Sequence, residues 1–154
     1  MERLKIKREK LLSALERLEE SVEDFEKIQK LTDEDFKELS GRFDFLEKEN
    51  IYRSRRDSMV QRFEFSSDLF WKYLKLFMTE SLKRTIELNA PKSIIRDAHN
   101  TKLITEEDAR ELIKMINDRN LSSHIYKEEV ADEVASKIPT YYKIMKKYAE
   151  VLVA

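Results

Sequence analysis

Apolar residues recur at steps of three and four positions through most of this chain, and very little interrupts them. Only one glycine and two prolines occur among the 154 residues. An all-β fold needs many tight turns, which glycine and proline supply, so their scarcity argues against such a fold. The hydrophobic fraction of 41% and the charged fraction of 40% are typical of long amphipathic helices. The sequence therefore predicts an all-α protein whose length fits a single domain over residues 1–154.

Two helices are predicted in the first third of the chain. A stripe of apolar residues marks the first, over about residues 2–30, and consists of Leu4, Leu11, Leu15, Leu18, Val22 and Phe25. Thr32–Asp35 resembles a capping box and predicts the start of a second helix, with Gly41 inside it. The following stretch, 47–50, is interpreted either as a turn or as more helix.

The most regular pattern begins near Ser54, where a third helix is predicted to start. Its inner stripe consists of Met59, Phe63, Ser66, Phe70, Tyr73 and Phe77. Apolar residues occur on nearly every side between positions 69 and 78, which indicates either the central helix of a bundle or an additional subunit interface. The arginines at 53–56 are interpreted as a solvated helix start, with an anionic partner as the alternative.

Three further helices are predicted in the second half of the chain. Pro91 suits the first turn of a short helix, and Thr105–Asp108 is a second capping-box pattern. The last helix is predicted from about Lys127, with a kink at Pro139.

Between the last two of these helices lies an Arg-x4-His-x-Tyr segment, formed by Arg119, His124 and Tyr126. Arg119 extends the apolar stripe of Leu112 and Ile116, so its side chain is expected to point inward or into a cleft. A guanidinium is a natural ligand for phosphate, and a histidine can exchange protons near neutral pH.

Arg119 and His124 are five positions apart, which is about 140° around a regular helix. They can share one site only if the helix ends or distorts near Ser122–Ser123, or if a second subunit completes the pocket. Taken singly, each residue also has a structural interpretation: a salt-bridged arginine, a packed histidine and a packed tyrosine.

The composition excludes several other classes of site. Two histidines and no cysteine leave no recognisable zinc pattern, and a single glycine cannot make a glycine-rich phosphate loop, so no metal or cofactor is predicted. The net charge of −1 does not suit a sequence-independent nucleic-acid binder, although a local phosphate site stays open. No signal peptide or membrane span is found, and a cytoplasmic protein without membrane contact is expected.

The residues 118–126 resemble the motif of HEPN-fold proteins, and more narrowly the bacterial family of nucleotidyltransferase substrate-binding proteins, or HEPN toxins paired with minimal nucleotidyltransferases. Three more blocks carry the resemblance: residues 56–65, 90–98 and 138–142. The segment at about 32–53 departs from the family pattern and is interpreted as a helical insertion. The resemblance implies an antiparallel up-and-down bundle with a four-helix core, forming a homodimer whose cleft is lined by Arg119 and His124.

The resemblance also implies a function in a toxin–antitoxin-like pair with a minimal nucleotidyltransferase. Arg119 and His124 would be catalytic in metal-independent RNA cleavage, Asn120 and Arg119 would bind the substrate, and Tyr126 would be modified with AMP by the partner. The alternative is a non-catalytic subunit whose cleft presents a nucleotide or another substrate to the partner enzyme. A third hypothesis is a plain helical interaction module.

Overall fold

The computed structural model describes residues 2–42, 44–124 and 127–153, and of Ser123 and His124 it describes only the backbone. All regular structure in these ranges is helical, as the sequence predicts. The elements are α1 (Glu2–Lys30), α2 (Asp33–Ser40), α3 (Phe45–Leu76), a π-helical turn η1 (Phe77–Ser81), α4 (Pro91–Asn100), α5 (Glu106–His124) and α6 (Glu128–Val151).

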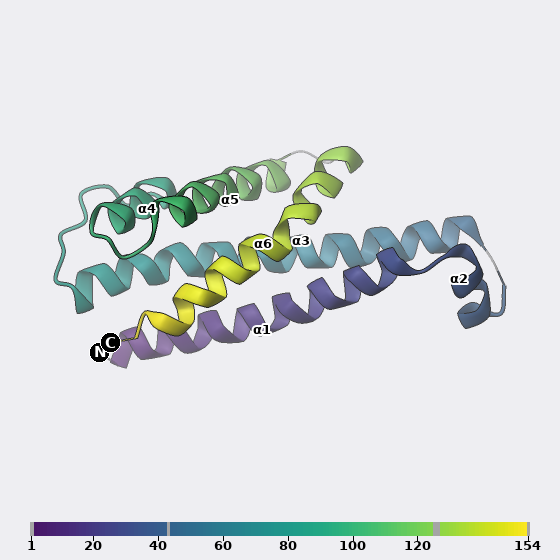
Figure 1. Cartoon of the computed structure of the whole chain (residues 1–154), viewed down its shortest axis with the longest axis horizontal. Coiled ribbons are helices and arrows are strands. Elements are labelled where there is room, and N and C mark those ends of the chain that lie inside the picture. Colours follow the sequence, from purple (N-terminus) through teal and green to yellow (C-terminus); the bar gives the residue numbers. More distant parts are fainter. Residues whose placement is uncertain (1, 43, 125–126, 154) are drawn as a thin grey trace.

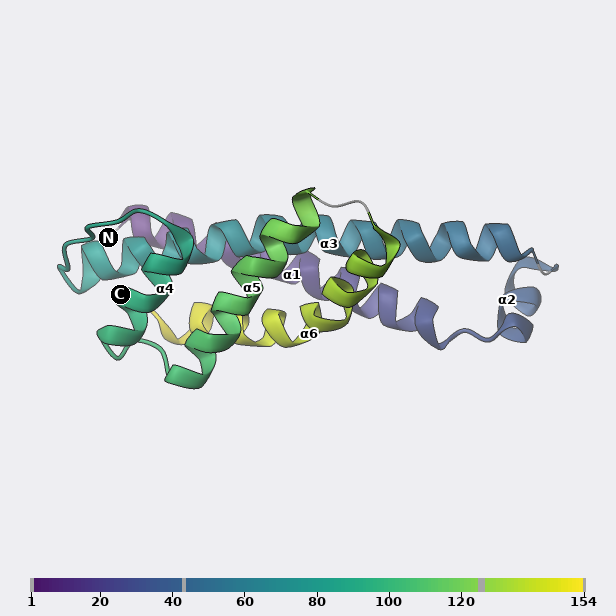
Figure 2. The same cartoon turned by 90° about the horizontal axis from the view of Figure 1, so that it is seen from above.

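The two longest helices, α1 and α3, run antiparallel along the length of the molecule (Figure 1). Helix α6 packs against both of them, while α4 and α5 pack against α3 (Figure 2). The beginning of α1 and the end of α6 lie at the same end of the bundle, where Arg8 Nε donates to the carbonyl of Ala149 at 2.8 Å. Helix α2 lies at the opposite end, outside the main bundle.

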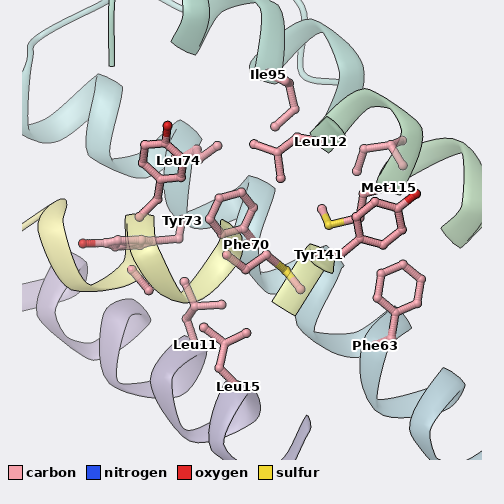
Figure 3. Packing of buried hydrophobic residues seen from close by; sticks show 14 of the residues in the cluster. Leu11, Leu15, Phe63, Phe70, Tyr73, Leu74, Ile95, Leu112, Met115 and Tyr141 are labelled. Carbon is pink, nitrogen blue, oxygen red and sulfur yellow. The ribbon is translucent and has the colours of Figure 1, made fainter. Parts of the chain in front are cut away.

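The core lies where α3 faces α1, α4, α5 and α6 (Figure 3). Phe70 and Tyr73 of α3 lie among side chains of α1 and α5, such as Leu11 and Leu112. Phe63 stacks on Tyr141 of α6 with ring centroids 5.8 Å apart. Each such side chain contributes about 1.5–3 kcal/mol by leaving water, so the apolar stripes hold the bundle together.

The boundary between α2 and α3 differs from the prediction. Gly41 does not lie inside a helix: it ends α2 in the left-handed conformation, with φ of 78°. Asp44 then caps α3 by accepting hydrogen bonds from the backbone of Leu46 and Glu47 at 3.0 and 3.2 Å. The third helix therefore begins about ten residues before Ser54, and the stretch 47–50 is helical. That the segment 32–53 is an insertion in a single domain stays a prediction.

The predicted helix starts agree with the structure elsewhere. The capping box at Thr32 is complete, with both hydrogen bonds between Thr32 and Asp35 at 3.1 Å. Thr105 Oγ1 likewise accepts from the backbone of Asp108 at 3.1 Å. Pro91 is in the first turn of α4, and Lys127 precedes α6. Pro139 lies inside α6, which bends along its length in Figure 2.

In the described part of the chain, none of the helices has both the length and the apolar character that crossing a membrane requires.

Candidate functional site

Arg119 lies at the end of the buried stripe of α5. Leu112, Met115 and Ile116 of this stripe are buried in the core, and Arg119 follows one turn after the last of them with 24% of its side chain exposed. This partly buried position agrees with the prediction that the arginine continues the apolar stripe. It also means that its charge must be compensated locally.

Two carboxylates of α3 compensate that charge. Nε and Nη2 of Arg119 donate to the two oxygens of Asp68 at 3.1 and 3.0 Å, and Nη1 donates to Glu64 at 3.4 Å. Ser122, one turn further along α5, donates to the other oxygen of Glu64 at 3.1 Å. The contact with Asp68 is the bidentate geometry in which a guanidinium and a carboxylate fit each other best.

The electrostatics of this cluster favour the charged arginine. The hydrogen bond to Asp68 raises the pKa of Arg119, while burial acts in the opposite direction. One guanidinium facing two carboxylates gives the trio a formal charge of −1. An incoming phosphate must therefore replace at least one carboxylate, because Nε, Nη1 and Nη2 of the guanidinium already donate to Asp68 and Glu64.

Asp118, next to Arg119, has a structural role. Its side chain is buried and accepts a hydrogen bond from the hydroxyl of Tyr141 at 2.5 Å, with the ammonium of Lys137 at 3.7 Å. Burial raises the pKa of Tyr141, and the bond to Asp118 acts in the same direction, so the phenol stays a donor. These contacts fasten the end of α5 to α6, and with it the backbone of Arg119.

The structure describes the other predicted site residues less completely. Asn120 is exposed on α5, beside Arg119. His124 is the last residue of α5, and its side chain lies outside what the structure describes, as does Tyr126 altogether. Helix α5 continues through Ser122–Ser123 and ends directly after them, at His124, so a site shared by Arg119 and His124 stays a prediction. On a regular helix the side chains of residues 119 and 124 point about 140° apart.

The chemistry open to this site follows from its side chains. It consists of an arginine, two carboxylates and a hydroxyl, which can bind an anion and transfer protons. In the described ranges, no three histidine or acidic side chains are grouped as metal ligands.

A comparison with known protein families assigns the chain to one of them. The model of the family described as "Nucleotidyltransferase substrate binding protein like" matches residues 7–154, which is nearly the whole sequence and includes α5 and the segment after it. The protein belongs to this family. The family that residues 118–126 and the three further blocks predict is therefore confirmed.

A solved structure has a similar fold. A protein from Thermus thermophilus, known from a crystal structure, shares 26% sequence identity with this family member, and the two structures align with a TM-score of 0.62. The match covers 89% of this chain and 99% of the Thermus chain. Among curated proteins, none matches the sequence.

Sequence reasoning missed a second ionic cluster in this family member, around Arg56. Its side chain is only 3% exposed, so the interpretation of the arginines at 53–56 as a solvated helix start is wrong for this residue. Nη1 of Arg56 donates to Glu128 at 2.6 Å and to Asp132 at 3.0 Å, both on α6, and Tyr52 donates to Asp132 at 2.9 Å. The cluster thus holds the first turns of α6, directly after the Arg-x4-His-x-Tyr segment.

The pKa shifts in this cluster follow from burial and pairing. Burial disfavours the charged form of Arg56, but its bonds to Glu128, Asp132 and Asp57 prevail and raise its pKa. Burial, reinforced by the bond to Asp132, raises the pKa of Tyr52 to about 12. A signal existed in the sequence: acidic residues occur four apart at 128 and 132, on one face of α6. However, no sequence pattern near these residues indicates that they pair with position 56, which is more than 70 residues away.

Proposed function

We propose that this protein is the HEPN-type subunit of a two-component system and works with a separately encoded minimal nucleotidyltransferase. The family name supports a nucleotidyltransferase partner. Arg119 and His124 would form a metal-independent RNA-cleaving site, and Tyr126 would be the point at which the partner controls it.

The observation that carries this proposal is the arginine at the end of a buried stripe. Arg119 is partly buried, and hydrogen bonds orient its guanidinium from α3 while Asp118 fixes its backbone to α6. Such an oriented guanidinium is suited to stabilise charge that develops on phosphate oxygens. A merely solvated arginine would not need this support.

The reaction follows from the groups that the motif contains. The ribose 2′-hydroxyl attacks the adjacent phosphorus, the bond to the 5′-oxygen breaks, and a 2′,3′-cyclic phosphate forms. His124 moves a proton between the attacking or leaving oxygen and water. Arg119 stabilises the phosphorane oxygens, and Asn120 orients the phosphate. None of these steps requires a metal ion.

Control through Tyr126 requires only the partner's ordinary chemistry. A nucleotidyltransferase would join the phenol oxygen to the α-phosphorus of ATP and release pyrophosphate. The product adds bulk and negative charge to the segment that contains His124. It would thereby repel an RNA phosphate from Arg119.

A homodimer would solve the geometric problem of the motif. On a regular helix, positions 119 and 124 of one chain are about 140° apart, and α5 is helical as far as position 124. A second copy placed across this end of α5 would bring one chain's histidine toward the other chain's arginine.

One observation favours the alternative, a non-catalytic substrate-binding subunit. Glu64 and Asp68 already occupy the guanidinium of Arg119 and leave the trio with a formal negative charge. In a binding subunit, these carboxylates would instead recognise a cationic or hydroxyl-bearing acceptor that the partner modifies.

An RNA cleavage assay in the presence of EDTA distinguishes the two functions. Wild-type protein is compared with Arg119→Ala and His124→Ala, and with two matched controls. Arg110→Ala removes an arginine of the same helix whose side chain is 73% exposed, and His99→Ala removes the only other histidine.

We expect cleavage that ends in 2′,3′-cyclic phosphate in the wild type and in both controls. A loss of about 100-fold or more is expected in the two site variants, as for removal of a general acid–base group or an oxyanion donor. Absence of cleavage on a broad panel of RNAs, or equal cleavage by folded Arg119→Ala protein, would reject the ribonuclease site and favour the binding subunit.

A further inference from the structure

A hollow lies on the outer face of α3, toward its C-terminal end, and it has a volume of about 410 Å³. The first two turns of α1 and the loop before α4 close its sides. It is lined by Arg3, Lys7, Trp71, Lys72, Lys75, Leu76, Thr79, Glu80 and Asn89. Its volume lies within the range of small-molecule sites, about 300–1,000 Å³.

The charge of this hollow is unlike that of the chain. Its lining contains four basic side chains and one acidic side chain, whereas the whole protein has a net charge of −1. The acid, Glu80, faces Arg3 at 3.6 Å, and within the residues that the structure describes the three lysines of the lining form no ion pair, so they make a cationic group around the cavity. Like charges gathered around a concave surface repel one another and attract an anion.

An aromatic ring is present beside these cations. Trp71 is the only tryptophan of the sequence, and its side chain is half-buried in the wall of the hollow. The ammonium of Lys72 lies 5.8 Å from the centre of the ring. An exposed lysine can leave this position to meet a phosphate, and the face of the indole is then open for a stacked base.

The hollow is separate from the Arg119 cluster but adjacent to it. Glu64, Asp68 and Arg119 do not line it, although Asp68 precedes Lys72 by one turn of α3. At a rise of 1.5 Å per residue, Asp68 and Lys75 are separated by about 10 Å along the helix.

We propose that this hollow is a nucleotide-binding site, in which a base stacks on Trp71 and the attached phosphate binds Lys72 and Lys75. Lys7 and Arg3 close the anionic end, and Thr79 and Asn89 offer polar contacts to the sugar. The nucleotide is either free in solution or one residue of an RNA strand. The inference concerns a different set of residues from the cleavage site and holds whether or not Arg119 and His124 cleave RNA.

The chain contains its own reporter for this site. Because Trp71 is the only tryptophan, intrinsic indole fluorescence reports on this hollow alone. Full-length protein is titrated with AMP, ATP, a short oligoadenylate RNA and inorganic pyrophosphate, with free tryptophan amide as the control for light absorption by the bases. We expect saturable quenching by AMP or ATP if the ligand is a free nucleotide, and by the oligoadenylate alone if it is part of a strand.

Matched variants test the assignment of the lysines. Lys72→Gln/Lys75→Gln should weaken binding by about tenfold or more, since each lysine would lose a charge-assisted hydrogen bond to the phosphate. Lys10→Gln/Lys143→Gln removes two lysines that are exposed on α1 and α6, outside the hollow, and should leave binding unchanged. Trp71→Leu, followed by calorimetry, should weaken binding about tenfold through lost stacking.

Three results would overturn the proposal. One is the absence of saturable quenching with every probe. Another is equal affinity for pyrophosphate and ATP, which would show that the base takes no part. The third is equal weakening in the two double-lysine variants, which would show only a general charge effect. Arg119→Ala protein should bind as the wild type does, so failure of the cleavage site leaves this test intact.

Discussion

Asp68 binds the guanidinium of Arg119 through both of its carboxylate oxygens, at 3.1 and 3.0 Å. The two residues are 51 positions apart and join the last third of α3 to the end of α5. This pair orients the arginine and also competes with any phosphate that approaches it. The first prediction separates these two effects.

Replacing Asp68 with asparagine should strengthen anion binding at Arg119. Asparagine keeps the size of the side chain and one acceptor oxygen, but it removes a negative charge that faces the incoming phosphate. We expect RNA affinity at Arg119 to rise by about three- to tenfold, measured by filter binding at fixed salt, because two unit charges about 4 Å apart interact by roughly 1 kcal/mol in a water-like dielectric.

The matched control for this variant is Glu16→Gln, which removes an exposed carboxylate of α1. If Asp68→Asn gains no more affinity than Glu16→Gln, the carboxylate does not compete with phosphate. In that case Asp68 only positions the arginine.

Arg56→Met should destabilise the protein by about 3 kcal/mol. The substitution leaves Glu128 and Asp132 facing each other without the buried guanidinium that binds both. Breaking a buried charge network by removing one partner costs about 3–5 kcal/mol, and the partial exposure of both acids places the value at the lower end. Urea unfolding followed by circular dichroism measures the difference.

Arg53→Met is the matched control for this variant. Its side chain is 49% exposed and reaches Glu128 only at 3.6 Å, so we expect a change within about 0.5 kcal/mol. Equal destabilisation by the two substitutions would contradict the role assigned to Arg56.

Gly41→Ala should cost about 1–2 kcal/mol even though an alanine Cβ would meet no atom within 4 Å. The cost arises from the backbone, since Gly41 has φ of 78° and only glycine adopts that conformation without strain. Gly41→Asn should cost less, because asparagine tolerates the left-handed region. Thermal unfolding of both variants tests this order, and a stable Gly41→Ala protein would argue that α2 does not need this cap.

Asp108 should make the protein sensitive to acid. Burial alone would raise the pKa of this carboxyl, but hydrogen bonds from Lys147 and Tyr148 prevail and lower it below the usual 3.8. A lowered pKa in the folded state means that the stabilisation is present above the unfolded pKa and is lost as the pH falls through the folded one. The free energy of unfolding should therefore decrease below about pH 4.

The comparison that isolates this carboxyl is Asp108→Asn. This variant should be less stable than the wild type by about 1–2 kcal/mol at pH 7. The difference should shrink in urea titrations as the pH approaches about 3, because the wild-type carboxyl then becomes protonated. A difference that stays constant over this range would mean that Asp108 does not titrate with unfolding.

Local sequence patterns predicted the features that depend on neighbouring residues, namely where helices lie, where they start and which face is buried. The steps of three and four predicted the buried stripes of α1, α3 and α5, and Thr32 and Thr105 marked helix starts through hydrogen bonds three residues away. Position 119 could be placed on the inner face of α5 for the same reason. The break at Gly41 was missed because a helix-weakening glycine inside a pattern and a glycine that ends a helix look alike along the sequence.

Only the tertiary structure decided which distant charges meet. The sequence by itself determined the all-helical fold and the position of Arg119, because helical periodicity depends on contacts within a few residues. The pairing of Arg119 with Asp68, the burial of Arg56 against α6 and the basic hollow at Trp71 each depend on how whole helices pack. No local spacing encodes such contacts, since their energy exists only after the helices have come together.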